Sequence, residues 1–242
     1  MKIFGDTNSG NCLKVKWVCD HLRLPYRWID IDTMKGETRT PEFLKLNGAG
    51  QVPAVELDDG RTLAQSNAII RYLARGSDLI PKDAYAAAKM DEWLFWEQYS
   101  HEPYIAVARF QLAYLGKAAN ELEPRIFERG RAALQRMDEA LTGRDFLVGS
   151  ALSLADVSLV AYTRLAEEGG GFTLADGNLP PLGNYGRPGM ALGDVTDDGR
   201  DDLAFATATG VGVYKWIAPG QWQNISGTLA NIGAVENDID PK

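Results

Sequence analysis

Residues 51–75, QVPAVELDDGRTLAQSNAIIRYLAR, predict two short strands followed by a helix. Residues 52–57 and 61–65 are strand-like runs, and the DDG between them is a hairpin signal. Ser66 stands at the head of the helical run 66–75. We therefore expect a β-hairpin that leads directly into a helix.

The residues before this stretch alternate between strand and helix patterns. KIFG at 2–5 and YRWIDID at 26–32 are apolar strand patterns, and TPEFLKLN at 40–47 is a short helix pattern. Residues 9–22 place Cys12, Val15 and Val18 at helical spacing, with Ser9 as the N-cap. The order β-α-β-α-β-β-α predicts a small mixed sheet with helices on its faces.

From about residue 83 to residue 168 the pattern is helical throughout. We expect helices over 84–116, kinked at Pro103, over 121–143, ended by Gly143, and over 153–168, begun by a Ser153–Asp156 capping box. GNLPPLGNYGRPG at 177–189 then indicates a linker. The predicted organisation is an α/β domain over 1–80, an all-α domain over 81–176 and an irregular, β-rich tail over 177–242.

Composition excludes several classes of protein. The chain has 242 residues and a net charge of −8, which argues against nucleic-acid and acidic-membrane partners. No apolar run approaches the ~18 residues of a membrane span. Cys12 and Cys19 lie seven positions apart, about 10.5 Å along one helix, which is too far for a disulfide. With no signal-peptide pattern at residue 1, we expect a reduced, cytoplasmic protein.

Three short motifs carry a family resemblance. QVPAV at 51–55, AQSNAIIRYLA at 64–74 and SLADVSLVAYT at 153–163, in that order, resemble the cytosolic glutathione S-transferases over residues 1–176. The resemblance implies a thioredoxin-like first domain, an α-helical second domain and a homodimer, with apolar surface around Trp93. It also implies an enzyme that activates the thiol of its co-substrate glutathione for attack on a small hydrophobic electrophile.

The same resemblance implies which residues bind glutathione. Pro53 would follow a cis peptide bond and turn the backbone of Val52 toward the cysteinyl unit, while Gln65 and Ser66 would take the γ-glutamyl end. Gln51 stands where a basic residue is frequent, so recognition of the glycine carboxylate departs from the family pattern. Gln65 replaces a frequent Glu, which removes a charge that would face the ligand amine.

Thiol activation needs a donor beside the sulfur. A free thiol has a pKa of about 8.5, and lowering it by about two units requires about 2.7 kcal/mol of preference for the thiolate. The family places the donor just after the first strand, and we assign it to Ser9, because SGNC matches the serine-type pattern, with Asn11 as the alternative. Cys12 is either a redox cysteine or, as we prefer, a small core residue.

The electrophile would bind between the two domains, beside residues 95–110. Candidates there are Phe95, Tyr99, Tyr104 and Arg109. The competing interpretation is that at least half of the aromatic residues Trp93, Phe95 and Trp96 are helix-bundle core. His21, His101 and Asp156 are interpreted as structural rather than catalytic.

The tail carries a calcium-loop pattern, GDVTDDGRDDL at 193–203, which resembles one FG-GAP repeat of an integrin-like propeller. The resemblance implies weak calcium binding by side chains of Asp194, Thr196, Asp198 and Asp202 and by the Arg200 carbonyl. Propellers need several blades, so we interpret this loop as a passenger, followed by a hairpin from 201–208 and 210–216. Two alternatives stay open: a non-catalytic glutathione-fold binding protein, and a calcium-binding adhesion-type module carrying a decayed enzyme.

Overall fold

The computed structural model describes residues 1–170, 172, 190–193, 202–207, 210–218 and 221–224, the last four ranges as backbone strands only. The chain divides into two compact units, Met1–Thr173 and Leu174–Lys242. Among the described residues, no helix combines the length and apolar character needed to cross a membrane.

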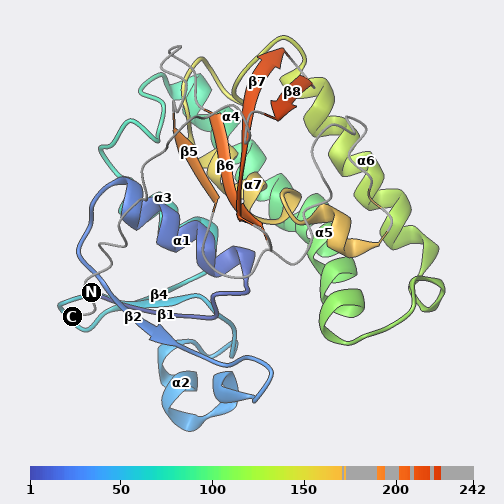
Figure 1. Cartoon of the computed structure of the whole chain (residues 1–242). Helices are drawn as coiled ribbons and strands as arrows, with labels where there is room; N and C mark the ends of the chain where they lie inside the picture. The colour runs from blue at the N-terminus through green and yellow to red at the C-terminus, as the bar shows by residue number, and fades with distance from the viewer. Residues whose placement is uncertain (171, 173–189, 194–201, 208–209, 219–220, 225–242) are drawn as a thin grey trace. The chain divides into compact units, whose positions relative to one another are not determined.

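A four-stranded mixed sheet organises the start of the first unit. Its strand order is β2 (Arg27–Asp30), β1 (Lys2–Gly5), β3 (Ala54–Glu56), β4 (Thr62–Ala64), with β1 parallel to β2 and the other pairs antiparallel. Helices α1 (Gly10–His21) and α3 (Ser66–Leu73) lie on one side of the sheet, and α2 (Pro41–Leu46) lies on the other (Figure 1). A short 3₁₀ turn, η1 (Glu37–Arg39), precedes α2. The predicted order of strands and helices and the β3–β4 hairpin are confirmed.

The rest of the first unit is helical. It contains α4 (Ala84–Trp96), α5 (Glu102–Arg109), α6 (Pro124–Leu141) and α7 (Leu154–Thr163), with 3₁₀ turns η4 (Ala119–Glu121) and η5 (Ala166–Gly169). The expected helix over 84–116 is interrupted by two π turns, η2 (Glu97–His101) and η3 (Phe110–Tyr114). Pro103 lies in the first turn of α5, directly after η2. The irregularity expected at Pro103 is therefore a π turn directly before this residue. Proline lacks an N–H and clashes with the preceding turn of a regular α-helix, which favours a break in the helix at this point.

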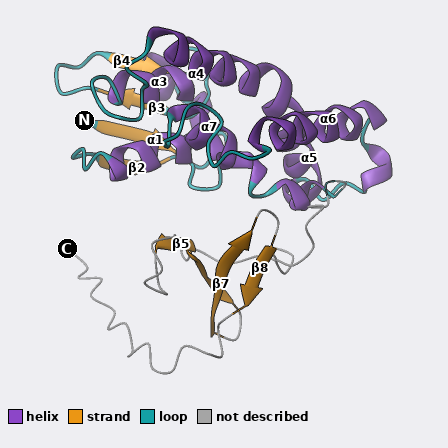
Figure 2. Cartoon of the chain, turned by 90° about the horizontal axis from the view of Figure 1, so that it is seen from above, coloured by secondary structure: helices purple, strands orange, loops and turns teal. Residues whose placement is uncertain are grey.

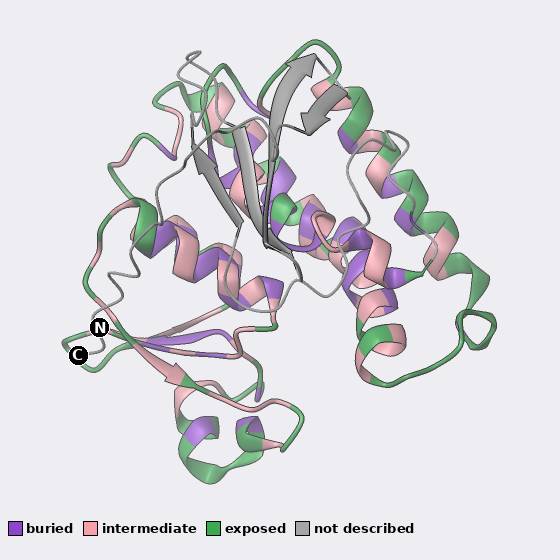
Figure 3. Ribbon diagram, viewed as in Figure 1, coloured by how far each residue is buried: buried purple, intermediate pink, exposed green. Residues whose placement is uncertain are grey.

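One hydrophobic core joins the sheet to the helices. Ile3, Val18 and Ile70 pack in the same buried cluster as Met90 and Leu159. A second cluster gathers side chains from α5, α7 and the segment after it, including Tyr162 and Phe172. Figure 3 shows the buried residues running through α1 and α7, so the first unit folds around α7 as a central helix.

The predicted capping box at the start of α7 is confirmed. The Asp156 carboxylate accepts hydrogen bonds from the Ser153 N–H at 2.9 Å and from the Ser153 hydroxyl at 2.8 Å. It also accepts from the Leu147 N–H at 2.8 Å. Asp156 therefore fixes the preceding loop as well as the helix start, which agrees with its structural interpretation.

The second unit contains an antiparallel sheet in sequential order, β5 (Met190–Gly193), β6 (Asp202–Thr207), β7 (Gly210–Ala218) and β8 (Gln221–Asn224). Several of its strands are drawn as arrows in Figure 2. The pairing of β6 with β7 confirms the hairpin expected from the two apolar runs of the tail.

Candidate active site

The turn between β1 and α1 holds the first candidate, Ser9. Its side chain is the N-cap of α1, and its oxygen accepts from the Cys12 N–H at 3.4 Å. Its own N–H donates to the Asp6 carbonyl at 3.0 Å, which fixes the turn. A half-buried hydroxyl therefore stands at a helix N-terminus, where the free N–H groups favour negative charge.

Tyr162 of α7 meets this turn from the helical part. Its phenol oxygen accepts from the Asn11 N–H at 3.3 Å and hydrogen-bonds the Ser9 side chain. Burial raises the pKa of Tyr162, so the phenol stays protonated and available as a donor. A Cβ atom on Gly10 would lie 2.9 Å from the Tyr162 ring, so glycine is needed for this approach. The sequence analysis did not identify Tyr162 as a residue of the site. The one sequence signal of its close approach was Gly10, because glycine is a weak helix former and stands here in a first helical turn.

Cys12 is a buried thiol. Its sulfur accepts from the Asp6 N–H at 3.4 Å, and burial raises the pKa of the Cys12 thiol to about 11. Since the thiolate is the reactive form, this residue serves as core. Cys12 and Cys19 are both free and buried, as the predicted reduced state requires.

Asn11, the alternative donor, is engaged by the protein. Its Oδ1 atom accepts from Lys14 Nζ at 2.8 Å, from the Ser66 hydroxyl at 2.9 Å and from Gln98 Nε2 at 3.1 Å. Its side chain also hydrogen-bonds Glu102. The amide therefore ties α1 to α3 and to the π turn η2.

These contacts continue into a buried ion pair. Lys14 Nζ donates to Glu97 Oε2 at 2.8 Å, and both side chains are 0% exposed. The same Oε2 atom also accepts from Asn67, Gln98 and Ser158. Burial lowers the pKa of Lys14, while the Glu97 charge acts against that shift. We call Asn11, Lys14, Ser66, Asn67, Glu97, Gln98 and Ser158 the polar cluster; it joins α1, α3, η2 and α7.

The predicted glutathione-binding residues gather between α2 and the start of α3. The Val52–Pro53 peptide bond is cis, as expected. Gln65 has φ of +69°, a left-handed value that a side chain adopts only under strain, and it caps α3 without a side-chain hydrogen bond. The first N–H groups of α3 therefore have no side-chain acceptor from the cap. Gln51 is exposed, and its carbonyl accepts from Asn47 Nδ2 at 2.7 Å.

The predicted electrophile residues separate into two groups. Arg109 reaches the β1–α1 turn, where its Nη1 donates to the Asn8 carbonyl at 3.2 Å, and Tyr104 is half-buried. Tyr99 is 85% exposed and Phe95 is 78% exposed. Trp93 is buried in the core with Trp96 packed against it, so the bundle-core interpretation holds for these two aromatic residues and not for Phe95.

His101 is buried, as a structural histidine. Its Nε2 lies 2.8 Å from the Thr163 hydroxyl, and burial lowers the pKa of His101 to about 4. Its Nδ1 has no hydrogen-bond partner among the described residues.

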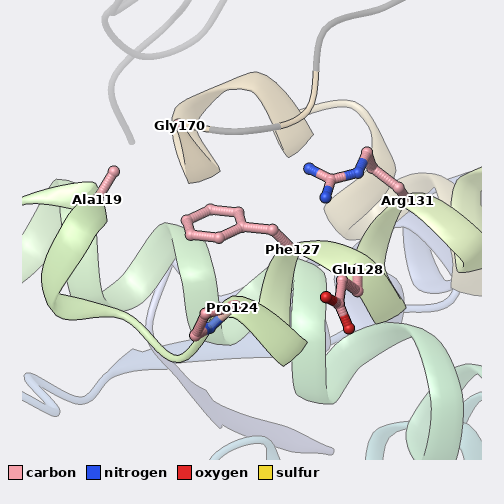
Figure 4. Close-up of a pocket in the computed structure, with 6 residues that line it drawn as sticks. All are labelled: Ala119, Pro124, Phe127, Glu128, Arg131 and Gly170. Atoms are coloured by element: carbon pink, nitrogen blue, oxygen red, sulfur yellow. The ribbon is translucent and has the colours of Figure 1, made fainter.

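A cavity of about 260 Å³ lies elsewhere, beside the start of α6. Figure 4 shows Phe127 beneath Gly170, with Glu128 and Arg131 along one side. None of its lining residues is a predicted site residue, and we assign it no function.

The calcium candidates lie almost wholly outside the described residues. Asp194, Thr196, Asp198 and Arg200 fall in the segment between β5 and β6, and Asp202 is described only as backbone of β6. Within the part of the chain that the structure describes, no group of three or more His, Cys, Asp or Glu side chains could hold a metal ion.

Comparison with known proteins identifies a family. Residues 8–75 match the family description "Glutathione S-transferase, N-terminal domain", and residues 104–177 match "Glutathione S-transferase, C-terminal domain". The crystal structure of a glutathione S-transferase from Pseudomonas fluorescens is 44% identical, with a TM-score of 0.69 over 72% of this chain and 87% of that one. Glutathione S-transferase 3 of Zea mays is 29% identical over 65% of this chain and 74% of its own length. Ure2p in complex with S-hexylglutathione is 26% identical, with a TM-score of 0.62 over 70% of this chain and 85% of that one.

Proposed function

The chain belongs to the glutathione S-transferase family, and we propose that it binds glutathione and uses Ser9 to activate the thiol for attack on a small electrophile. The observation that carries the proposal is the Ser9 hydroxyl, half-buried at the N-terminus of α1 and in hydrogen-bond contact with Tyr162. A thiolate placed there would accept from the hydroxyl and lie near the positive end of the helix dipole.

The state of Asn11 supports Ser9 over the alternative donor. The Nδ2 group is the only part of the Asn11 side chain that could donate to a thiolate, and the side chain already hydrogen-bonds Glu102, so a thiolate would have to displace that contact. Ser9 accepts from the Cys12 N–H and can also accept the proton of the Tyr162 phenol that it contacts, so its own O–H can turn toward a thiolate. Asn11 then acts by holding α1 against α3.

The start of α3 supports binding of the γ-glutamyl end. Its first N–H groups have no side-chain cap, and such groups suit a carboxylate. The Ser66 hydroxyl donates to Asn11, so its remaining capacity is to accept, which suits the ligand ammonium. Gln65, Val52 and Pro53 complete the proposed glutathione site, and the S-hexylglutathione complex of Ure2p is consistent with such a ligand in this fold.

A homodimer is the proposed assembly. Tyr85, Phe95 and Tyr99 lie on α4 and η2 and are 75%, 78% and 85% exposed. Large exposed aromatic residues along one helix favour a protein partner, and a second copy is what the family resemblance implies. Light scattering at micromolar protein would show a mass near twice 26.5 kDa; a mass of one chain would contradict this.

We also propose a cytoplasmic location, because the free, buried cysteines Cys12 and Cys19 suit a reducing compartment.

The test is conjugation of glutathione to chlorodinitrobenzene by the purified protein. Ser9→Ala should lower kcat/KM about tenfold or more at neutral pH, while the Kd for glutathione stays within a few-fold, because the hydroxyl serves the thiolate. Ser150→Ala, at an exposed serine, is the matched control. Unchanged turnover in Ser9→Ala would remove Ser9 from the mechanism. Glutathione binding without any turnover would favour the non-catalytic alternative.

A second candidate, weak calcium binding by the tail, is favoured by one observation. The sequential four-stranded antiparallel sheet β5–β8 has the topology of a propeller blade, and the FG-GAP-like loop connects its first two strands. We expect an affinity no better than about millimolar, since residues 177–242 carry one such repeat and a propeller is built from several. Saturation at micromolar calcium, followed by NMR at Gly193, would instead make the tail a functional module and favour the adhesion-type alternative.

A further inference from the structure

Arg109 is held rigidly beside the β1–α1 turn. Its Nε donates to Glu168 at 2.6 Å, its Nη1 to the Asn8 carbonyl at 3.2 Å and its Nη2 to the Tyr114 hydroxyl at 3.0 Å. The side chain is 12% exposed. A guanidinium carries five N–H groups, so these three bonds leave one hydrogen on each terminal nitrogen for a further acceptor.

Arg164 brings a second guanidinium to the same place. It follows the last residue of α7 and lies over the Trp17 ring, 5.4 Å from the ring centroid. Its buried Nε atom has no hydrogen-bond partner among the described residues, and none of their carboxylates forms a salt bridge with it. Burial lowers the pKa of Arg164 and the nearby Arg109 charge lowers it further, while Glu168 and Tyr114 act against that shift. Glu168 therefore forms a salt bridge with Arg109, whereas Arg164 forms none with the described residues.

A partly buried guanidinium without a salt bridge is costly, and a bound anion would lower that cost. Arg109 touches Asn8, whose Cα lies about 3.8 Å from that of Ser9. An anionic group bound by the two arginines would therefore lie close enough to a thiolate at Ser9 for one small electrophile to reach both.

We propose that Arg109 and Arg164 form an anion subsite of the electrophile site, so that the preferred electrophile carries a carboxylate. This inference rests on the proposed function, since it needs a glutathione thiolate at Ser9. Arginine suits this role because its planar N–H groups match the two oxygens of a carboxylate. Arg164, whose guanidinium forms no salt bridge with the described residues, supplies the selectivity, and Arg109 aligns the substrate beside Asn8.

The reaction keeps the anion as a spectator. For an aryl chloride, the thiolate sulfur forms a bond to the ring carbon, the carbon–chlorine bond breaks, and chloride leaves with the electron pair. The carboxylate changes neither charge nor bonding. Its contact with the arginines fixes the ring so that the reacting carbon faces the sulfur.

The probes are a chlorodinitrobenzoate and the chlorodinitrobenzamide of the same substitution pattern, which differ in charge and share the leaving group. The wild-type protein should prefer the benzoate in kcat/KM by about tenfold or more, as expected for a charge-assisted contact. Arg164→Gln should remove most of that preference by raising KM for the benzoate alone. The fold should tolerate the change, because it breaks no salt bridge among the described residues. Arg129→Gln, at an exposed arginine on α6, is the matched control and should keep the preference.

Binding of the two glutathione conjugates, measured by calorimetry, distinguishes failure of the anion subsite from failure of the proposed function. Tighter binding of the carboxylate conjugate, lost in Arg164→Gln, supports the subsite whether or not turnover is observed. Equal binding of both conjugates by the wild type overturns the subsite and leaves the proposed function intact. Binding of neither conjugate, together with no binding of glutathione, overturns the proposed function, and the subsite with it.

Discussion

The Lys14–Glu97 pair should be a major contributor to the stability of the first unit. Both side chains are fully buried, and the charged atoms are 2.8 Å apart. Replacing Lys14 by Met leaves the Glu97 carboxylate buried without its cation, which costs about 3–5 kcal/mol in comparable cases. Glu97 Oε2 keeps its bonds from Asn67, Gln98 and Ser158, so we expect the lower end, about 3 kcal/mol.

The same helix offers a matched control. Lys16 pairs with Asp20 at 2.6 Å, but its side chain is 38% exposed. An exposed pair of this spacing contributes about 0.3–0.5 kcal/mol, so Lys16→Met should be nearly neutral. The two variants make the same chemical change two residues apart on α1, and they differ in burial.

Urea unfolding at pH 7, followed by tryptophan fluorescence, measures both effects. A loss of about 3 kcal/mol corresponds to a Tm lower by roughly 6–12 °C for a unit of this size. The double variant Lys14→Met with Glu97→Gln removes both charges and should be more stable than the sum of the two single changes predicts, by about 2 kcal/mol. Strictly additive losses, or a Lys14→Met variant as stable as Lys16→Met, would refute the view that the charges depend on each other.

Three further predictions concern the framework of the site. Burial lowers the pKa of His101 to about 4, so folded protein resists protonation that the unfolded chain accepts below about pH 6.5. Stability should therefore fall by up to about 3 kcal/mol between pH 6.5 and pH 4 relative to His101→Gln, and parallel urea curves would contradict this. Asp156→Ala should cost about 3 kcal/mol in the same assay, because Ser153 and Leu147 lose their acceptor; a loss under 1 kcal/mol would exclude the assigned cap. Gly10→Ala should cost about 1–3 kcal/mol and lower turnover with chlorodinitrobenzene, since its Cβ meets the Tyr162 ring; wild-type values in both assays would count against the close approach.

Local signals were sufficient for most of the fold. Ser9 and Ser66 begin the helices that the sequence pattern assigned to them, and the DDG turn joins two paired strands. The capping box at Ser153 could be predicted because its hydrogen bonds span three residues. The π turns η2 and η3 could not, because a π turn depends on how a helix packs, and only Pro103 pointed to an irregularity there.

Some features of the candidate site could also be predicted from the sequence, and others could not. The cis peptide before Pro53 followed from a family motif. Arg109 was predicted only as a residue of the electrophile cleft, and its contact with the β1–α1 turn was not predicted. Tyr162 lies 151 positions from Asn11 along the chain, and Arg164 meets Trp17 only after α7 has packed on α1. Contacts over such separations are decided by tertiary packing, which no local pattern reports.

Lys14 shows why sequence alone misjudges the polar cluster. In the sequence LKVKW, Lys14 and Lys16 are equivalent surface-type residues, since lysine is almost never fully buried unless it is paired. Helix α1 shares a buried cluster with the strand residues Ile3 and Val55 and also packs against α3 and α7, so a single apolar stripe does not describe its buried surface. The partner that makes the burial of Lys14 tolerable is Glu97, 83 residues away on a π turn. Because Lys14 also holds Asn11, which holds Ser66, a change at Lys14 should loosen the start of α3 and weaken glutathione binding, without touching the ligand. Weaker glutathione binding in Lys14→Met than in Lys16→Met, measured on the folded proteins, would show that the cluster positions the site as well as stabilising the fold.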